Sequence, residues 1–170
     1  MTTVLPLPKR IYLLRHAKSG WALPGERDFD RTLNDAGYAE AERVAGLAAS
    51  KGYRPDLIVS STAKRCRETA EAIRSAFSTE IECRFVDELY NCPADNYLEI
   101  LASLTEFSST MLVGHNPAIE EVLFMLIGSE AAQEAVPQGF PTSGLAVLDY
   151  DPDTRESGSG HWSLSDFLIG

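Results

Sequence analysis

Short apolar runs alternate with helix-like patterns along nearly all of this 170-residue chain, and this alternation constrains the fold more than any other feature. It is typical of α/β proteins, in which helices cover a mainly parallel sheet. We predict strands over residues 10–14, 57–60, 81–86, 111–113, 145–150 and 161–167. We predict helices over residues 35–50, 63–77, 94–104 and 117–127, the last with Pro117 at its favoured first position.

The length fits one ordinary globular domain, and the sequence contains no internal repeat and no long low-complexity linker. Residues 151–160 (DPDTRESGSG) are polar and rich in glycine, and we interpret them as a hairpin connection between the last two predicted strands. We therefore expect a single domain over residues 1–170.

The net charge of −10 argues against binding to nucleic acid or to an acidic membrane, because both partners require a basic surface. No apolar run approaches the roughly twenty residues that span a bilayer, and prolines interrupt the N-terminal segment where a signal peptide would be apolar. Cys66, Cys83 and Cys92 form no CxxC pair, so we expect reduced thiols in a cytoplasmic protein. Because neither these cysteines nor the histidines have the spacing of metal ligands, we expect no metal and no other cofactor.

Three of the predicted strands end in polar residues that can carry chemistry. The first ends in Arg15 and His16, the second leads into a helix that carries Arg65, and the fourth ends in Gly114 and His115. In a parallel α/β sheet, ligands bind beyond the carboxyl ends of the strands, where helix N-termini converge. We therefore expect these four charged or imidazole side chains to meet at one edge of the sheet.

The residue types in this group suit a phosphoryl group. The two arginines offer planar forks that match phosphate oxygens and keep their charge near neutral pH. Ser61 or Thr62 before one helix, and Asn116 before another, are expected N-caps that leave backbone N–H groups facing an anion. A neutral imidazole is a competent nucleophile toward phosphorus. With neither a Walker lysine nor a carboxylate cage for magnesium, the pattern favours metal-independent phosphoryl transfer through histidine.

Each motif taken alone also has a structural interpretation. An Arg-His pair can end a strand without any chemical role, and an arginine in a helix, such as Arg67, usually faces solvent or forms a salt bridge. A Gly-His-Asn-Pro turn often does no more than connect a strand to a helix. The functional hypothesis therefore depends on the three motifs lying together at one edge of the sheet.

On these motifs the chain resembles the histidine phosphatase superfamily, the phosphoglycerate-mutase-like group. LLRHAKS is similar to the family's Arg-His-Gly motif after the first strand, STAKRCRETA to its SxxxRxxxTA motif, and VGHNP to its late Gly-His. RHAKS, DFDRTLNDAG and PTSGLAVL are most similar to the short SixA-type phosphohistidine phosphatases.

The resemblance implies a three-layer α/β/α sandwich and gives each of the four side chains a role. His16 would be the nucleophile, and Arg15, Arg65 and His115 would bind the phosphoryl oxygens and stabilise the pentavalent transition state. Ser19, close to the nucleophile in the sequence, is a further candidate for phosphate binding.

Two positions differ from the family pattern. Ala17 replaces the glycine of Arg-His-Gly, as in the short subgroup. Asn91 stands where longer relatives have a glutamate as general acid, and an amide cannot donate a proton as a carboxylic acid does. The nearby Asp87 and Glu88 are expected to be exposed loop carboxylates, and the sequence does not determine whether one of them, or no residue, is the general acid.

The missing acid points to a substrate whose leaving group departs easily. A phosphorylated imidazole can take a proton from solvent on its second ring nitrogen and leave as neutral imidazole, whereas an alkoxide benefits from a positioned acid. About fifty residues separate Arg65 from His115, which is too few for a lid, so we expect an open site that admits a side chain on a protein surface. Our preferred hypothesis is a phosphatase for protein phosphohistidine or another phosphoramidate.

Three alternatives remain: a promiscuous small-molecule phosphomonoesterase, a phosphomutase, and a noncatalytic phosphoryl-binding module. The partner would accordingly be a phosphorylated protein or a small phosphorylated substrate, and the sequence does not determine the oligomeric state. His161, in the last predicted strand, is expected to be structural.

Three residues near the nucleophile have open roles. Lys18 could add a cation to the site, and Trp21 could form a wall of the pocket or only anchor its loop. Arg31 could reach the site, or it could form an ion pair with Asp28 or Asp35.

Overall fold

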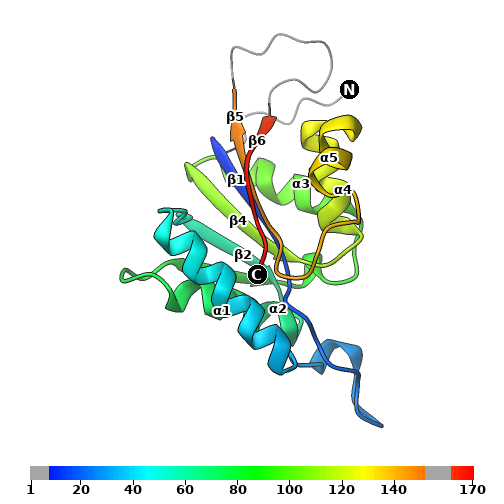
Figure 1. The fold of residues 1–170 in the computed structure, drawn as a ribbon. Helices are drawn as coiled ribbons and strands as arrows, with labels where there is room; N and C mark the ends of the chain where they lie inside the picture. The colour runs from blue at the N-terminus through cyan, green and yellow to red at the C-terminus, as the bar shows by residue number, and fades with distance from the viewer. Residues whose placement is uncertain (1–7, 152–161) are drawn as a thin grey trace.

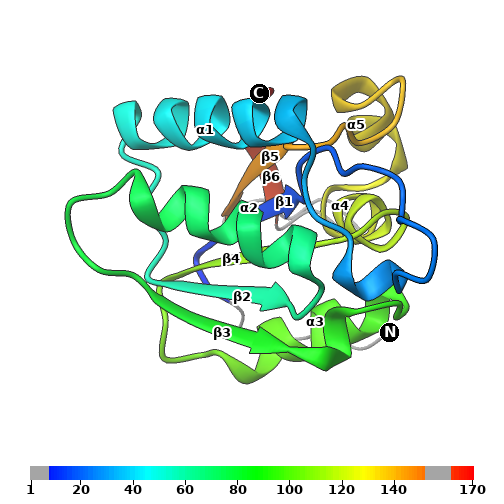
Figure 2. The ribbon, with the colours of Figure 1, turned by 90° about the horizontal axis from the view of Figure 1, so that it is seen from below.

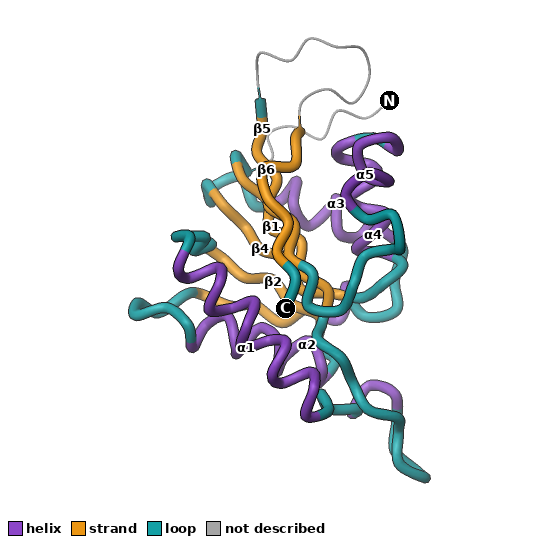
Figure 3. Tube along the Cα trace, in the orientation of Figure 1, coloured by secondary structure: helices purple, strands orange, loops and turns teal. Residues whose placement is uncertain are grey.

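The computed structural model describes residues 8–151 and 162–170, which form a six-stranded sheet flanked by helices (Figure 1). The strands are β1 (Arg10–Arg15), β2 (Leu57–Ser61), β3 (Glu82–Val86), β4 (Ser109–Gly114), β5 (Leu145–Tyr150) and β6 (Trp162–Leu168). The α-helices are α1 (Asp35–Ser50), α2 (Lys64–Ser75), α3 (Ala94–Ser103), α4 (Ala118–Ile127) and α5 (Ser129–Ala135). Two 3-10 helices, η1 (Asp28–Asp30) and η2 (Asp87–Leu89), lie in connecting segments. Every predicted strand and helix is present within a few residues, and Figure 3 shows their alternation along the chain.

The sheet is mainly parallel, as predicted. Its order is β3-β2-β4-β1-β5-β6, in which β3, β2, β4 and β1 run parallel to one another. β5 is antiparallel to β1, and β6 is antiparallel to β5. The consecutive parallel strands need crossover connections, which the helices supply.

Helices cover both faces of this sheet, which confirms the three-layer α/β/α architecture. α1 and α2 pack on one face, side by side, and α3, α4 and α5 lie on the other (Figures 1 and 2). Successive residues of β1 therefore alternate between two cores. Ile11 and Leu13 pack with α3, α4 and α5, whereas Tyr12 and Leu14 pack with α1 and α2. A strand buried on both faces has a continuous apolar sequence, and this is why IYLL was recognisable as a strand.

The expected helix N-termini were wrong in detail. The N-cap of α2 is Ala63, because the Thr62 hydroxyl donates to the Asp87 carboxylate at 2.6 Å and the Ser61 hydroxyl accepts from the Ala63 N–H at 3.2 Å. Pro117 is the N-cap of α4 and not its first residue. Asn116 still accepts a hydrogen bond from the N–H of Glu120, at 3.2 Å, so its side chain satisfies one donor of the first turn.

Three short elements were not predicted: η1, η2 and α5. The two 3-10 helices have three residues each, too few for a periodic apolar pattern. α5 follows α4 directly, with Gly128 at a φ of 89° between them, and its seven residues contain one fully buried side chain, Ala132. A helix with so little buried surface leaves no clear amphipathic signal.

His161 and nearly all of the predicted 151–160 hairpin connection lie outside the described residues. Within residues 8–151 and 162–170, no helix is long and apolar enough to cross a membrane.

Two glycines of α1 provide a matched test of how this helix positions the segment after β1. A Cβ atom on Gly37 would lie 1.9 Å from the main-chain oxygen of Lys18, whereas a Cβ on Gly46 would meet nothing within 4 Å. We predict that Gly37→Ala lowers the free energy of unfolding by about 1–3 kcal/mol or more, because the main chain at Lys18 cannot move aside to relieve the overlap as a flexible side chain could. Gly46→Ala should raise it by about 0.5–1 kcal/mol, because alanine favours the helix. Urea unfolding of both variants measures the difference, and equal effects would contradict the close contact.

Candidate active site

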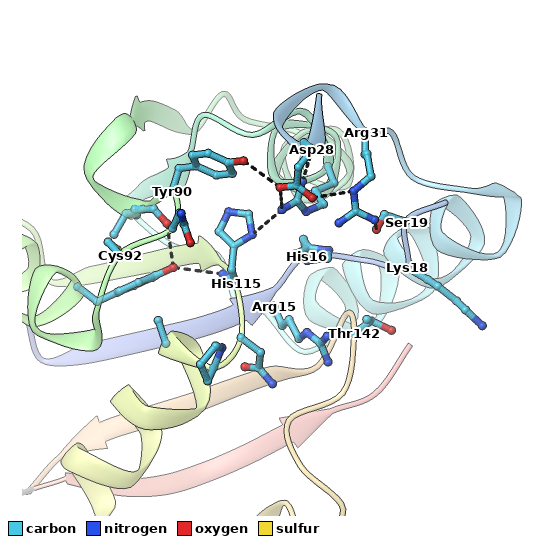
Figure 4. A pocket seen from close by; sticks show the side chains of 17 residues that line it. Arg15, His16, Lys18, Ser19, Asp28, Arg31, Tyr90, Cys92, His115 and Thr142 are labelled. Atoms are coloured by element: carbon cyan, nitrogen blue, oxygen red, sulfur yellow. Dashed lines mark hydrogen bonds and ion pairs between the residues drawn. The ribbon is translucent and has the colours of Figure 1, made fainter. Parts of the chain in front are cut away.

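A cavity of about 700 Å³ lies beyond the carboxyl ends of β1 and β4 (Figure 4). Arg15, His16, Arg65 and His115, which the sequence analysis singled out, all line it. The neighbouring loops contribute further lining residues, among them Lys18, Ser19, Asp28, Arg31, Tyr90 and Asn91.

The strand register explains why residues so distant in the sequence meet here. Arg15, the last residue of β1, is paired with Gly114, the last residue of β4. The next residue, His16, donates its backbone N–H to the Gly114 oxygen at 3.0 Å. β2 lies on the other side of β4 and leads directly into α2, which carries Arg65 in its first turn. The carboxyl ends of three neighbouring strands therefore deliver the four side chains to one place.

His16 is buried with a defined tautomer. Its side chain is 8% exposed, and Nδ1 lies 2.7 Å from the main-chain oxygen of Ala17. Because a carbonyl oxygen only accepts hydrogen bonds, Nδ1 carries the proton and Nε2 keeps its lone pair. Burial lowers the pKa of His16 to about 3, so the ring is neutral near pH 7. A neutral imidazole with a free Nε2 can attack phosphorus.

His115 lies beside His16, with ring centroids 5.4 Å apart and ring planes inclined at 61°. Burial, together with the charge of Arg65, lowers the pKa of His115 to about 4. Arg65 Nη2 donates toward His115 Nδ1 at 3.4 Å, which leaves Nε2 as the protonated nitrogen, 2.8 Å from the Ser61 hydroxyl oxygen. The main-chain N–H of His115 donates to the Tyr97 hydroxyl at 3.1 Å.

The two arginines are held mainly through main-chain oxygens. Arg15 donates to the oxygen of Phe140 at 2.8 Å, and Arg65 donates to the oxygen of Asp28 at 2.8 Å and to its carboxylate at 3.1 Å. Among the described residues, the Nε atoms of Arg15 and Arg65 are buried without a hydrogen-bond partner. A buried donor without a partner costs about 1–3 kcal/mol.

Of the residues whose roles the sequence left open, three line the cavity and one does not. Ser19 lines the cavity, and its hydroxyl accepts from Arg31 Nη1 at 3.2 Å. Arg31 reaches the cavity, and it also forms an ion pair with Asp28, with 2.9 Å between Nε and Oδ1. The two roles considered for Arg31 are therefore compatible. Lys18 also lines the cavity. Trp21 is 95% exposed and is not among the lining residues, so the interpretation as a pocket wall was wrong.

The structure places Asn91 and the two neighbouring carboxylates differently with respect to the cavity. Asn91 lines the cavity, whereas Asp87 and Glu88 are exposed and do not line it. Arg67 is also remote from the cavity and donates to the main-chain oxygen of Thr62 at 2.8 Å.

Sequence reasoning missed Asp28 and Tyr90 as cavity residues. Asp28 lies in the DFDRTLNDAG segment that carried part of the resemblance, and Tyr90 directly follows the leucine used to align Asn91. Both signals were present, but neither indicated that the two side chains contact each other, with 2.9 Å between the Tyr90 hydroxyl and Asp28 Oδ2. Within residues 8–151 and 162–170, no group of three histidine, cysteine, aspartate or glutamate side chains could hold a metal ion.

The chain is similar to proteins of one family. A sequence profile for the histidine phosphatase superfamily (branch 1) matches residues 11–97. An uncharacterized chloroplastic protein of Arabidopsis thaliana is 32% identical over 93% of this chain and 76% of its own length. An uncharacterized protein of Mycobacterium tuberculosis is 32% identical over 88% of this chain and 90% of its own length.

Solved structures show the same similarity. A candidate phosphohistidine phosphatase SixA from Agrobacterium tumefaciens is 55% identical, with a TM-score of 0.87 over 95% of this chain and 97% of that one. The protein histidine phosphatase SixA in complex with tungstate is 19% identical and shares the fold, with a TM-score of 0.76 over 94% of this chain and 96% of that one.

The lowered pKa values of His16 and His115, to about 3 and about 4, predict that both rings stay neutral from about pH 5 to pH 8. Nitrogen-15 NMR of histidine-labelled protein should show Nδ1 of His16 protonated and Nε2 unprotonated throughout this range. The same rings in urea-unfolded protein should titrate near the ordinary value of about 6.5. A folded-state titration of His16 near pH 6.5, identified by its loss in a His16→Gln variant, would contradict the buried neutral tautomer.

Proposed function

The chain belongs to the histidine phosphatase superfamily and is a phosphatase; we propose that it acts through a phosphoryl group carried on Nε2 of His16. The observation that carries this proposal is the neutral, buried His16, whose unprotonated Nε2 belongs to a side chain that lines the same cavity as Arg15 and Arg65. No metal ion is required for the reaction as we propose it.

In the first step, Nε2 of His16 forms a bond to phosphorus while the bond to the leaving group breaks and its electron pair stays on the leaving atom. Arg15 and Arg65 would bind the equatorial oxygens, where negative charge is spread in the transition state. Nδ1 of His16 keeps its proton and its contact with the Ala17 oxygen, 2.7 Å away, so the ring that becomes positively charged is already oriented and stabilised.

In the second step, water attacks the phosphohistidine and the bond between phosphorus and Nε2 breaks, which regenerates neutral His16 and releases phosphate. His115, with its ring centroid 5.4 Å from that of His16, would donate its Nε2–H to a phosphoryl oxygen by exchanging its present contact with the Ser61 hydroxyl, at 2.8 Å, for that oxygen. Ser19 and its partner Arg31 line the same cavity and would add hydrogen bonds to the bound phosphate.

We propose protein phosphohistidine, or another phosphoramidate, as the substrate class. Asn91 supplies no acidic proton in the cavity, and a protonated imidazole leaves without one. The candidate SixA from Agrobacterium tumefaciens, 55% identical to this chain, is named as a phosphohistidine phosphatase, which supports the same class. A small-molecule phosphomonoesterase, a phosphomutase and a noncatalytic binding module are the alternatives that the experiment must separate.

The proposal predicts that His16→Ala reduces kcat/KM by roughly 10⁴-fold or more. The variant and the wild type should be compared with p-nitrophenyl phosphate and with a histidine-phosphorylated protein, each with and without EDTA. Activity that requires His16 and persists in EDTA supports the proposal, as does a labelled phosphoenzyme that is stable to alkali and labile to acid. Binding without release would favour the noncatalytic module, and transfer of phosphate between two substrates would favour the mutase.

Arg65 and Arg67 provide a matched pair for the electrostatic part of the proposal, because both lie on α2 but only Arg65 lines the cavity. Arg65→Gln should lower kcat on the order of 10²–10³-fold, since it removes charge from the transition state. Arg67→Gln should leave kcat close to that of the wild type. Similar losses of kcat in both variants would contradict this role of Arg65, and unfolding curves of the two proteins would show whether the losses come from a less stable helix.

A further inference from the structure

Asp28 is the one carboxylate among the described residues that line the cavity. It begins η1, in the segment between β1 and α1, and Figure 4 shows its side chain between those of Tyr90 and Arg31. Its presence needs an explanation, because a carboxylate in a site for a phosphoryl dianion weakens the binding of that dianion.

Three groups from three different segments hold this carboxylate. Arg31 Nε contacts Oδ1 at 2.9 Å, while Arg65 Nη2 and the Tyr90 hydroxyl contact Oδ2 at 3.1 Å and 2.9 Å. His115, after β4, faces the same group across Arg65. The carboxylate is therefore fixed next to Arg65, the arginine that we place on the phosphoryl oxygens.

The same contacts keep Asp28 ionised. Partial burial works to raise its pKa, but the hydrogen bond from Tyr90 and the charge of Arg65 outweigh burial and hold the pKa below its ordinary value. At neutral pH Asp28 is thus an acceptor of hydrogen bonds and cannot act as a proton donor.

Asp28 also has room for one more donor. A carboxylate has about four acceptor sites; Oδ2 accepts two hydrogen bonds, Oδ1 accepts one, and the side chain is 55% exposed. Next to it the Tyr90 ring packs edge-on against Phe29, with centroids 5.1 Å apart, and forms an aromatic wall. An unoccupied anionic acceptor beside an aromatic ring is a suitable environment for a planar cationic ring.

We propose that the Asp28 carboxylate accepts a hydrogen bond from the distal ring nitrogen of a phosphorylated imidazole and so selects phosphohistidine over phosphate esters. This inference rests on the proposed function and goes beyond it, because it identifies a residue that recognises the leaving group.

The reaction balances without any proton transfer. The substrate binds with its distal nitrogen protonated, Nε2 of His16 bonds to phosphorus, and the electron pair of the broken bond stays on the proximal nitrogen. The leaving group departs as neutral imidazole with the distal N–H still on Asp28. An ester oxygen has no such N–H, so esters experience only the repulsion between Asp28 and the phosphoryl group.

The contribution of Asp28 must depend on pH. A carboxylate raises the pKa of an adjacent imidazolium, so above that pKa a larger fraction of bound substrate is in the reactive, protonated form. Below it the substrate is already protonated, and Asp28 stabilises the reactant at least as much as the transition state, so it gives no advantage. Four groups face Asp28, namely Arg31, Arg65, Tyr90 and His115. Burial raises the pKa of Tyr90 and lowers that of His115 to about 4, so neither of these two rings changes charge over the pH range of this effect.

Asp28→Asn tests the proposal, with Asp30→Asn as the matched control on the same 3-10 helix. Asp30 pairs with Arg27 at 2.9 Å and does not line the cavity. For each protein, kcat with N-phosphoimidazole and with p-nitrophenyl phosphate is measured from about pH 5.5 to pH 9, with the uncatalysed rate subtracted. The ratio of the two activities cancels any change in Arg65 that both substrates share.

We expect the ratio of phosphoimidazole to ester activity to fall by about three- to tenfold in Asp28→Asn at the alkaline end of the pH range. This fall corresponds to an apparent pKa of the bound phosphoimidazole that is lower by up to about one unit. The ratio should approach that of the wild type at the acidic end, and Asp30→Asn should match the wild type throughout. A ratio unchanged at every pH would overturn the inference and leave Asp28 as a residue that only orients Arg65. Absence of His16-dependent phosphoimidazole turnover in the wild type would instead overturn the proposed substrate class, and this inference with it.

Discussion

The packing of buried Arg65 and His16 against half-buried Arg15 and His115 is the interaction on which the rest of this structure depends. Arg65 is 5% exposed and His16 8% exposed, in a chain whose net charge is −10. Buried charge is costly unless it is paired. Here the pairing is incomplete, because Arg15 donates to a main-chain oxygen and the Nε atoms of both arginines have no partner among the described residues. The remaining positive charge helps to keep His16 neutral, and it makes a phosphoryl anion the natural partner of the site.

Such a site requires the loops around it to be held in place. Two glycines allow this, because each lets its main chain lie close to another segment. Gly114 lies so near the Tyr97 hydroxyl that a Cβ would come within 2.1 Å of it, and that hydroxyl accepts from His115 N–H and donates to the oxygen of Leu89. The end of β4 is thereby joined to the segment that carries Tyr90. Gly37 allows α1 to touch the segment after β1 in the same way. Hydrogen bonds between rigid elements, rather than the loop sequences themselves, set the positions of the cavity residues.

These contacts also explain which features the sequence could predict. Strand ends such as Arg15 and His115 were predictable, because apolar runs mark the strands and a parallel sheet gathers their carboxyl ends at one edge. The N-cap of α2 was not, because Thr62 donates to Asp87, a partner 25 residues away that local preference does not reveal. Trp21 illustrates the same limit, since nothing in its local sequence distinguishes a pocket wall from a 95% exposed loop residue. Asp28 became visible only when three segments met around it.

The charge of that carboxylate bears on the leaving group. Longer relatives are expected to protonate an alkoxide with a glutamate, at a position that the sequence motifs predict to be Asn91 in this chain. Asp28 cannot replace that acid, because Tyr90 and Arg65 hold its pKa below the ordinary value and keep it ionised at neutral pH. Asp87 and Glu88 do not line the cavity. In the function that we propose, arginines bind the phosphoryl group and the one carboxylate among the described lining residues is ionised, so the site suits a leaving group that brings its own proton, such as a protonated phosphoimidazole.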